Sequence, residues 1–346
     1  MVRKSLGLGF RRPERIARAY GPLGVRSYTA TGESVDAIGR IEWPGGRAFA
    51  FTVFDDTDNA TVQNVGPVYD LLDDLGVRTT KSVWAMAGGG VPDIGGPTCD
   101  VPAYRDWTLR LQAAGFEIGS HGATPSTSPR EVVARSLARF RDIFGHDPDA
   151  LANHAECRES IYWGEDRVGG TSRLAYNLMT GFRRRGVFRG HREGDPLFWG
   201  DMCRQRIRYV RNFTYPGVNT LAACPVMPYY DPDRPYVQAW FASSEGANVT
   251  AFNRCLSEAE QDGLEAAGGA CIMYTHFASG FWSQGELNRR FRELMGRLAS
   301  KNGWFVPVTT LLDYVVEKRG LSVLTPAQRG TLERRWLRSK MRLGCN

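Results

Sequence analysis

The chain has 346 residues and a mass of 38.5 kDa, which allows one large domain or two ordinary ones. Hydrophobic residues make up 42% of the sequence and aromatic residues 11%. This is enough apolar surface for a sizeable core, so the composition excludes an intrinsically disordered chain. No stretch reaches the ~18 uncharged apolar residues that a membrane-spanning helix needs, and we expect no membrane span.

Basic residues outnumber acidic ones by 44 to 37, which gives a net charge of +7, and 39 of the 44 are arginines. Arginine suits carboxylates and phosphates because it offers a rigid fork of donors. The arginines are nevertheless scattered among acidic residues. They lack the interleaved aromatic residues of a single-strand-binding surface, and no DNA-binding motif is present. We therefore expect no nucleic-acid partner.

The seven cysteines form no C-x-x-C pair and are odd in number, which indicates a reducing compartment rather than a disulfide framework. The first 20 residues are basic, without the continuous apolar stretch of a signal peptide. Both observations lead us to expect a cytoplasmic protein.

Short β-rich stretches alternate with helical patterns from about residue 45 onward. Strands are expected at 48–54, 79–86, 116–120, 150–154, 236–241, 270–276 and 304–306, and helices at 65–75, 107–114, 129–144, 287–299 and 311–318. Residues 160–235 are rich in Arg, Gly, Trp and Pro and are expected to hold long loops around one or two helices and strands. The alternation predicts an α/β fold with a parallel sheet, which a closed barrel and an open doubly wound sheet satisfy equally.

Two helix starts carry clear capping signals. Ser128, followed by Pro129 and Glu131, has the pattern of a capping box. The second start is Thr325, followed by Pro326 and Gln328, and it predicts a separate basic amphipathic helix at the end of the chain.

Leu332, Trp336 and Met341 give that final helix an apolar face. We expect this face to dock onto the chain's own domain; docking onto a second copy, which would make a homodimer, is the alternative. The predicted organisation is an N-terminal arm (1–44), one α/β domain (45–320) and a basic helical tail (321–346).

Chemistry-bearing residues gather at the predicted carboxyl ends of strands, where parallel α/β folds place their sites. The first strand runs into Asp55-Asp56-Thr57-Asp58, and three of the five histidines, His121, His154 and His276, end later strands. Adjacent carboxylates repel, so one of them must be neutral, paired or bound to a metal. The alternative is that Asp58 or Asn59 caps the next helix while Asp55 and Asp56 lie in solvent.

Three of these segments together resemble the polysaccharide deacetylase superfamily (carbohydrate esterase family 4). They are Phe51-Thr-Val-Phe-Asp-Asp56, Gly115-Phe-Glu-Ile-Gly-Ser-His121 and Cys271-Ile-Met-Tyr-Thr-His276, and their order and spacing agree from about residue 45 to 318. The resemblance implies a distorted (β/α)7 barrel, one divalent metal ion of which zinc is the best candidate, and hydrolysis of an N-acetyl group on a sugar.

The resemblance also implies a role for each residue that matches the motifs. Asp55 resembles the general base, Asp56 the first metal ligand, His121 the second ligand and His276 the general acid that protonates the leaving amine. A general base must be deprotonated and a general acid protonated, and groups in different environments can hold these different protonation states.

The sequence departs from the family pattern at Thr57, where the family has a glycine, at Pro125 and in the arginine-containing segment. Pro125 occupies the position of the family's second histidine; Asp58, Thr124, Ser126 or water are candidates for the missing ligand, and His154 is preferred because it ends the neighbouring strand. The family's arginine-containing segment is also altered, and Arg158 is our candidate for the arginine that holds the base carboxylate.

Three residues in the Gly- and Arg-rich loops are candidates for substrate binding: Trp163, His191 and Trp199. The sequence thus predicts a metal-dependent hydrolase that removes an N-acyl group from a small or carrier-linked sugar or glycan precursor. The first alternative is a non-catalytic carbohydrate-binding or regulatory protein whose metal site has decayed. A hydrolase of a non-sugar amide or ester is the second.

Overall fold

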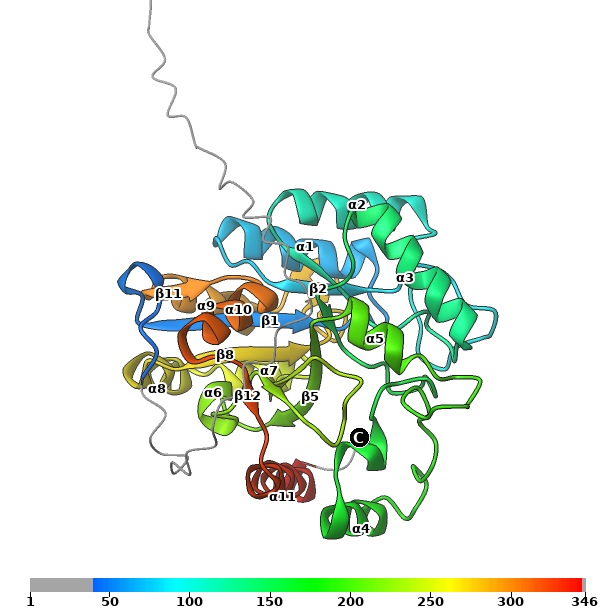
Figure 1. Ribbon diagram of the computed structural model, residues 1–346. Coiled ribbons are helices and arrows are strands. Elements are labelled where there is room, and N and C mark those ends of the chain that lie inside the picture. The colour runs from blue at the N-terminus through cyan, green and yellow to red at the C-terminus, as the bar shows by residue number, and fades with distance from the viewer. Residues whose placement is uncertain (1–39, 344–346) are drawn as a thin grey trace, which may run out of the picture. The chain divides into compact units, whose positions relative to one another are not determined.

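Seven parallel strands pair edge to edge into a closed ring in the computed structural model, which describes residues 40–343 (Figure 1). The ring is closed where β8 pairs with β1, in register from Ala50 against Ala270 to Asp55 against Thr275. In ring order the strands are β1 (Phe49–Asp55), β2 (Thr80–Val83), β3 (Glu117–Ser120), β4 (Ala150–Leu151), β5 (Tyr209–Tyr215), β7 (Ala239–Glu245) and β8 (Ala270–Thr275). The closure confirms the predicted seven-stranded barrel over the open sheet.

The first strand explains why the ring forms around it. Its sequence, FAFTVFD, has no alternation of apolar and polar residues, and all seven residues are buried. A strand of this kind must be covered on both faces, as in a barrel with helices outside. The strand β11 (Gly303–Phe305) pairs with the start of β1, and β2 pairs with its end.

Short strands extend or decorate the ring. The strand β6 (Tyr229–Tyr230) runs antiparallel to β7, and β12 (Ser322–Val323) pairs with β6. A separate two-stranded hairpin is formed by β9 (Trp282–Ser283) and β10 (Glu286–Leu287).

Helices cover the outside of the ring (Figure 1). Their bounds are α1 (Val62–Asp74), α2 (Pro102–Ala113), α3 (Arg130–Phe144), α4 (Gly170–Met179), α5 (Gly200–Arg206), α6 (Thr220–Ala223), α7 (Val249–Cys255), α8 (Glu258–Ala267), α9 (Arg289–Ala299), α10 (Val308–Arg319) and α11 (Pro326–Leu343), with 3-10 turns η2 (Pro44–Gly46) and η3 (Gly164–Arg167). Most of the predicted helices and strands are present with modest shifts of their ends.

Two local predictions need correction. The helix α3 begins one residue late: its N-cap is Pro129, and the Ser128 hydroxyl bonds to the Ser126 carbonyl instead of capping. The strand predicted at 150–154 is only two residues long. The strand β5 is one of the strands expected within residues 160–235, whose position the sequence pattern did not predict.

The C-terminal helix α11 packs on its own barrel, as predicted. The Thr325 hydroxyl accepts from the Gln328 backbone, and the Gln328 side chain accepts from the Thr325 backbone. Trp336 is 1% exposed and stacks on Tyr176 of α4, which runs beside α11 (Figure 1). Met341 is exposed and does not share this contact.

The six cysteines between residues 40 and 343 are all buried and free. No helix within these residues is both long enough and apolar enough to cross a membrane. The predicted N-terminal arm lies outside the described residues, except for its last five residues.

Candidate metal centre

The turn after β1 leaves the Asp58 side chain free for chemistry. The helix α1 is capped by Thr61, whose hydroxyl accepts from the Asn64 backbone while the Asn64 side chain accepts from the Thr61 backbone. The suggestion that Asp58 or Asn59 caps this helix is therefore wrong. The hydroxyls of Thr57 and Tyr104 lie 2.7 Å apart, and this contact anchors the turn beneath Asp58.

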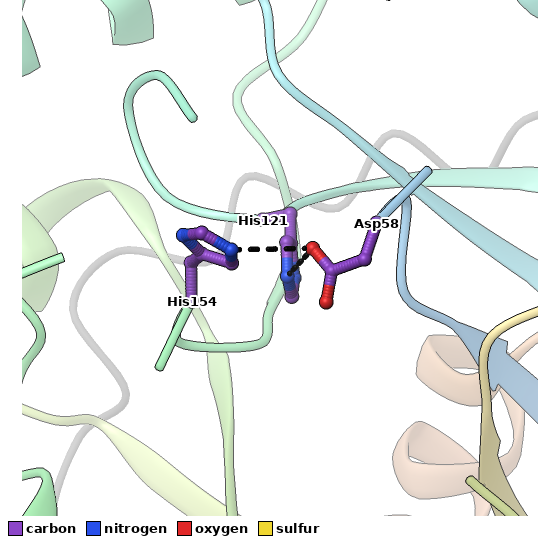
Figure 2. A group of neighbouring side chains, drawn as sticks. All are labelled: Asp58, His121 and His154. Carbon is purple, nitrogen blue, oxygen red and sulfur yellow. Dashed lines mark ion pairs between the residues drawn. The ribbon is translucent and has the colours of Figure 1, made fainter. Parts of the chain in front are cut away.

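Asp58 lies with two histidines from neighbouring strand ends (Figure 2). Its Oδ1 atom is 3.2 Å from Nε2 of His121, after β3, and 3.3 Å from Nε2 of His154, after β4. One ligand atom from each residue lies within 4.8 Å of the other two. Imidazole and carboxylate in this combination suit zinc and neighbouring divalent metals.

The atoms that face one another in this group have no other partner. Asp58 Oδ1, His154 Nε2 and both ring nitrogens of His121 are buried and make no hydrogen bond with the rest of the described chain. Ligand atoms about 2.0–2.1 Å from a tetrahedral zinc ion lie about 3.3 Å from each other, which matches the two short separations. The donor set therefore fits a divalent metal ion.

Contacts with Trp84 and Cys157 orient the two histidines. The Trp84 indole nitrogen donates to the backbone carbonyl of His121, and the Trp84 ring packs against both imidazoles. His154 Nδ1 lies 3.3 Å from the Cys157 sulfur, and the Cys157 thiol donates to the Thr124 carbonyl. A proton on His154 Nδ1 leaves the Nε2 lone pair directed at Asp58, as a metal ligand requires.

His276 approaches the group from the opposite side. Its Nε2 is 2.9 Å from Asp58 Oδ2, and its Nδ1 donates to the Ala247 carbonyl. Burial pushes the pKa of His276 down, but the Asp58 hydrogen bond and the charges of Asp56 and Asp58 outweigh it and raise the pKa to about 9. His276 therefore holds a proton on both nitrogens in this arrangement.

The pKa of Asp58 moves in the opposite direction. Burial raises it, but the charge of His121 and hydrogen bonds with His121, His154 and His276 hold it well below its ordinary range. The carboxylate therefore stays ionised and able to bind a cation.

Asp56 is paired with an arginine that sequence reasoning missed. The two Nη atoms of Arg211, from β5, lie 2.8 and 2.5 Å from the Asp56 oxygens, and both side chains are about 4% exposed. The Arg211 guanidinium also stacks on Tyr274. Asp56 Oδ1 remains 3.8 Å from Nδ1 of His121, so the pair lines the edge of the metal group.

Asp55 is enclosed on all sides. Its Oδ2 accepts from Tyr69 and lies 2.9 Å from the Lys81 ammonium, and its Oδ1 accepts from the backbone of Phe277. Asp55 and Lys81 are both 0% exposed. Because Phe277 follows His276, Asp55 fixes the strand end that carries His276. The sequence signal for this partner of Asp55 is Lys81, a charged residue inside the strand predicted at 79–86.

The structure brings four predicted site residues together, namely Asp56, His121, His154 and His276. Arg158 is not among them: its side chain is exposed, and Asp55 and Asp56 take their cations from Lys81 and Arg211. The Thr124 hydroxyl, an alternative ligand, is used in bonds with Ser126 and Ser128 within its own loop.

The three predicted substrate residues lie in different surroundings. Trp199 is buried, and its indole nitrogen donates to the Glu159 carbonyl, which is the pattern of a packing residue. His191 stacks on Tyr162, pairs with Asp166 and lines a cavity of about 400 Å³. Trp163 is half-buried and stacks on the Arg167 guanidinium.

Comparison with known proteins finds a likeness in structure and none in sequence. No protein-family profile and no curated protein sequence matches the chain. Among solved structures, the chain is similar to Puue allantoinase (14% identity, TM-score 0.49, covering 82% of this chain and 95% of the other). It is also similar to a probable polysaccharide deacetylase from Pseudomonas aeruginosa PAO1 (13%, 0.49, 82% and 96%) and to peptidoglycan deacetylase PdaC from Bacillus subtilis (12%, 0.39, 85% and 99%).

The similar regions cover 82–85% of this chain.

Proposed function

We propose that the chain is a metal-dependent hydrolase that removes an N-acyl group, such as acetyl, from a sugar or glycan precursor. The observation that carries the proposal is the convergence of Asp58, His121 and His154, whose facing atoms are buried and have no other partner. A divalent metal bound there would polarise an amide carbonyl and lower the pKa of a coordinated water.

His276 suits the role of general acid, in agreement with the sequence hypothesis. Its side chain is 18% exposed, it borders the metal group through Asp58, and both of its ring nitrogens face oxygen acceptors. Donation of the Nε2 proton to the departing amine nitrogen would avoid the expulsion of an amide anion.

For the general base, the geometry favours Asp56 over the predicted Asp55. Asp55 is closed off by Lys81, Tyr69 and the Phe277 backbone, whereas Asp56 lies beside His121 at the metal group. Arg211 orients the Asp56 carboxylate and neutralises part of its charge. We therefore assign Asp58, His121 and His154 to the metal, Asp56 to proton abstraction and Asp55 to positioning.

The test combines metal analysis with acetate release from N-acetylglucosamine and its 6-phosphate. We expect about one divalent ion per chain in the wild type, its loss in Asp58→Ala and His121→Ala, and loss of acetate release with it. His276→Gln should retain the metal and lose roughly 10²–10⁴-fold in rate. His146→Ala, at a distant turn where the imidazole bonds to Gln112, is the matched control.

Two results would favour the alternatives. A chain that holds no metal, and binds sugars equally well after both substitutions, would be a non-catalytic binding or regulatory protein. A metal-loaded chain that cleaves only non-sugar amides or esters would retain the chemistry and contradict the substrate. Acetate release from extracellular polymers alone would contradict our proposal of a cytoplasmic precursor substrate.

A further inference from the structure

Three arginines are buried within residues 40–343, and one of them has no anion beside it. Arg211 pairs with Asp56, and Arg234 pairs with Asp231 and Glu333. Arg167, at the end of η3, is 8% exposed and forms none of the ion pairs in this part of the chain. Burying a charge without a counter-charge is costly, so this exception needs an explanation.

Aromatic rings, not carboxylates, surround the Arg167 guanidinium. Its central carbon lies 3.1 Å from the centroid of the Trp163 ring and 5.4 Å from that of Trp336. Arg167 Nε and Trp336 Nε1 are both buried and lack a hydrogen-bond acceptor. A guanidinium N–H and a neighbouring indole N–H that both lack acceptors are suited to an anion that offers several acceptor oxygens.

The acidic residues closest in sequence are committed elsewhere. Asp166 pairs with His191, Arg173 and Arg192. The Glu165 side chain accepts from Asn177 and from the Gly186 backbone. The described chain thus supplies Arg167 with no counter-charge of its own.

Arg167 ends η3, which lies in the connection that follows β4, and the same connection carries His154 of the metal group. Burial lowers the pKa of Arg167 to about 9, and the charge of Arg211 adds to the effect. The Arg211 guanidinium lies over the Tyr274 ring, and the Tyr274 hydroxyl is 3.5 Å from His276 Nε2. Tyr274 therefore lies between Arg211 and the proposed acid.

We propose that Arg167 binds an anionic group, a carboxylate or a phosphate, on the substrate of the neighbouring metal group. The proposal rests on the proposed function, because the anion is taken to belong to the molecule that is hydrolysed there. Trp163 holds the guanidinium plane by stacking, which fixes the direction of its donors before the ligand arrives. The substrate class is then an acidic N-acyl sugar, and a neutral one binds less well.

The test compares three amino sugars that lack an N-acyl bond and are not turned over: glucosamine, glucosamine 6-phosphate and muramic acid, which carries a carboxylate. Calorimetric titration of the metal-loaded wild type should give at least about tenfold tighter binding of one or both acidic sugars. The better of the two identifies the anion. In Arg167→Gln the preference should fall to within about threefold.

Arg183→Gln is the matched control, because it removes the same charge from an exposed arginine of the same region. It should keep the wild-type preference. A preference that persists in Arg167→Gln, or a wild type that binds all three sugars equally, overturns the proposal.

Melting temperatures distinguish a binding role of Arg167 from a structural one. Arg167→Gln strands no carboxylate, so its melting temperature should stay close to that of the wild type. Arg234→Gln removes a buried cation from Asp231 and Glu333, leaves Asp231 with Arg329 alone, and should melt lower. Equal destabilisation by both substitutions would overturn the binding role. Acidic-sugar binding that depends on Arg167, without acetate release from any N-acyl sugar, would contradict the proposed function and leave Arg167 as an anion-binding residue.

Discussion

Arg211 holds Asp56 through two parallel hydrogen bonds, with both side chains almost fully buried. This pair changes how the acidic run after β1 is interpreted. Asp56 is the carboxylate that family resemblance assigns to the metal, yet its oxygens face a guanidinium, and Asp58 faces the two histidines.

Substitution of each aspartate by Asn distinguishes the metal ligand from the partner of Arg211. Asp58→Asn should weaken divalent-metal affinity by at least about 100-fold, because the charged ligand is lost. Asp56→Asn should retain the metal but lower the unfolding free energy by about 3–5 kcal/mol, because Arg211 is left buried and unpaired. Chelator competition and denaturant titration measure the two effects. Metal loss in Asp56→Asn alone would reverse the assignment.

The buried pair of Lys81 and Asp55 predicts a different pattern. Lys81→Met should destabilise the fold by about 3–5 kcal/mol, because the Asp55 carboxyl group is left at 0% exposure without its cation. The double variant Lys81→Met, Asp55→Asn should recover much of this loss in a denaturant titration. A double variant as unstable as the sum of the two single variants would show that the two groups are not coupled.

Cys157 provides a test of how His154 is oriented. Cys157→Ala removes the sulfur beside His154 Nδ1 and should weaken metal binding by about 10–100-fold. Cys157→Ser should restore part of the affinity, since a hydroxyl also accepts from Nδ1. Cys203→Ala, another buried free cysteine, is the control for loss of a thiol. Equal affinities for all four proteins, measured with a chromophoric chelator, would remove Cys157 from the site.

Glu117, at the start of β3, predicts a pH dependence of stability. Burial raises its pKa, against hydrogen bonds with Thr309 and Thr80 that lower it. The folded chain therefore holds this proton to higher pH than the unfolded chain does. The stability contribution of Glu117 is complete below its ordinary pKa and declines as pH rises from there through the raised value.

Glu117→Gln preserves the shape of the side chain and abolishes this titration. Relative to the wild type, the variant should gain stability between pH 5 and pH 8, as measured by denaturation midpoints. A difference between the two proteins that is constant across this range would mean that Glu117 titrates normally.

The sequence predicts the histidines of the site better than its carboxylates. His121, His154 and His276 were identified because each ends a strand, and parallel strands direct such residues to one edge. Asp55, Asp56 and Asp58 lie within four positions of one another. Which of them meets the histidines depends on the turn anchored by Thr57 and Tyr104, a contact 47 residues apart that no local pattern reveals.

Arg211 was missed for a related reason. It lies in β5, a strand within residues 160–235, where turn-forming residues and arginines hide the apolar pattern. The prediction of Arg158 rests on its place near the family's altered arginine-containing segment, and it concerns the base carboxylate, Asp55; the sequence offers no partner for Asp56. Ring closure was likewise open, because alternating strands and helices do not specify which two strands pair last.

The pairing of β8 with β1 also determines how early the barrel can close while the chain is being synthesised. One edge of β1 has β2 as an early neighbour, while most of the other edge waits for residues 270–275. At about 5–20 residues per second the ribosome needs on the order of 10–40 s to supply them. Asp58 and His276 are 218 positions apart, so the nascent chain carries an open, apolar strand edge and an incomplete candidate site until its last quarter emerges.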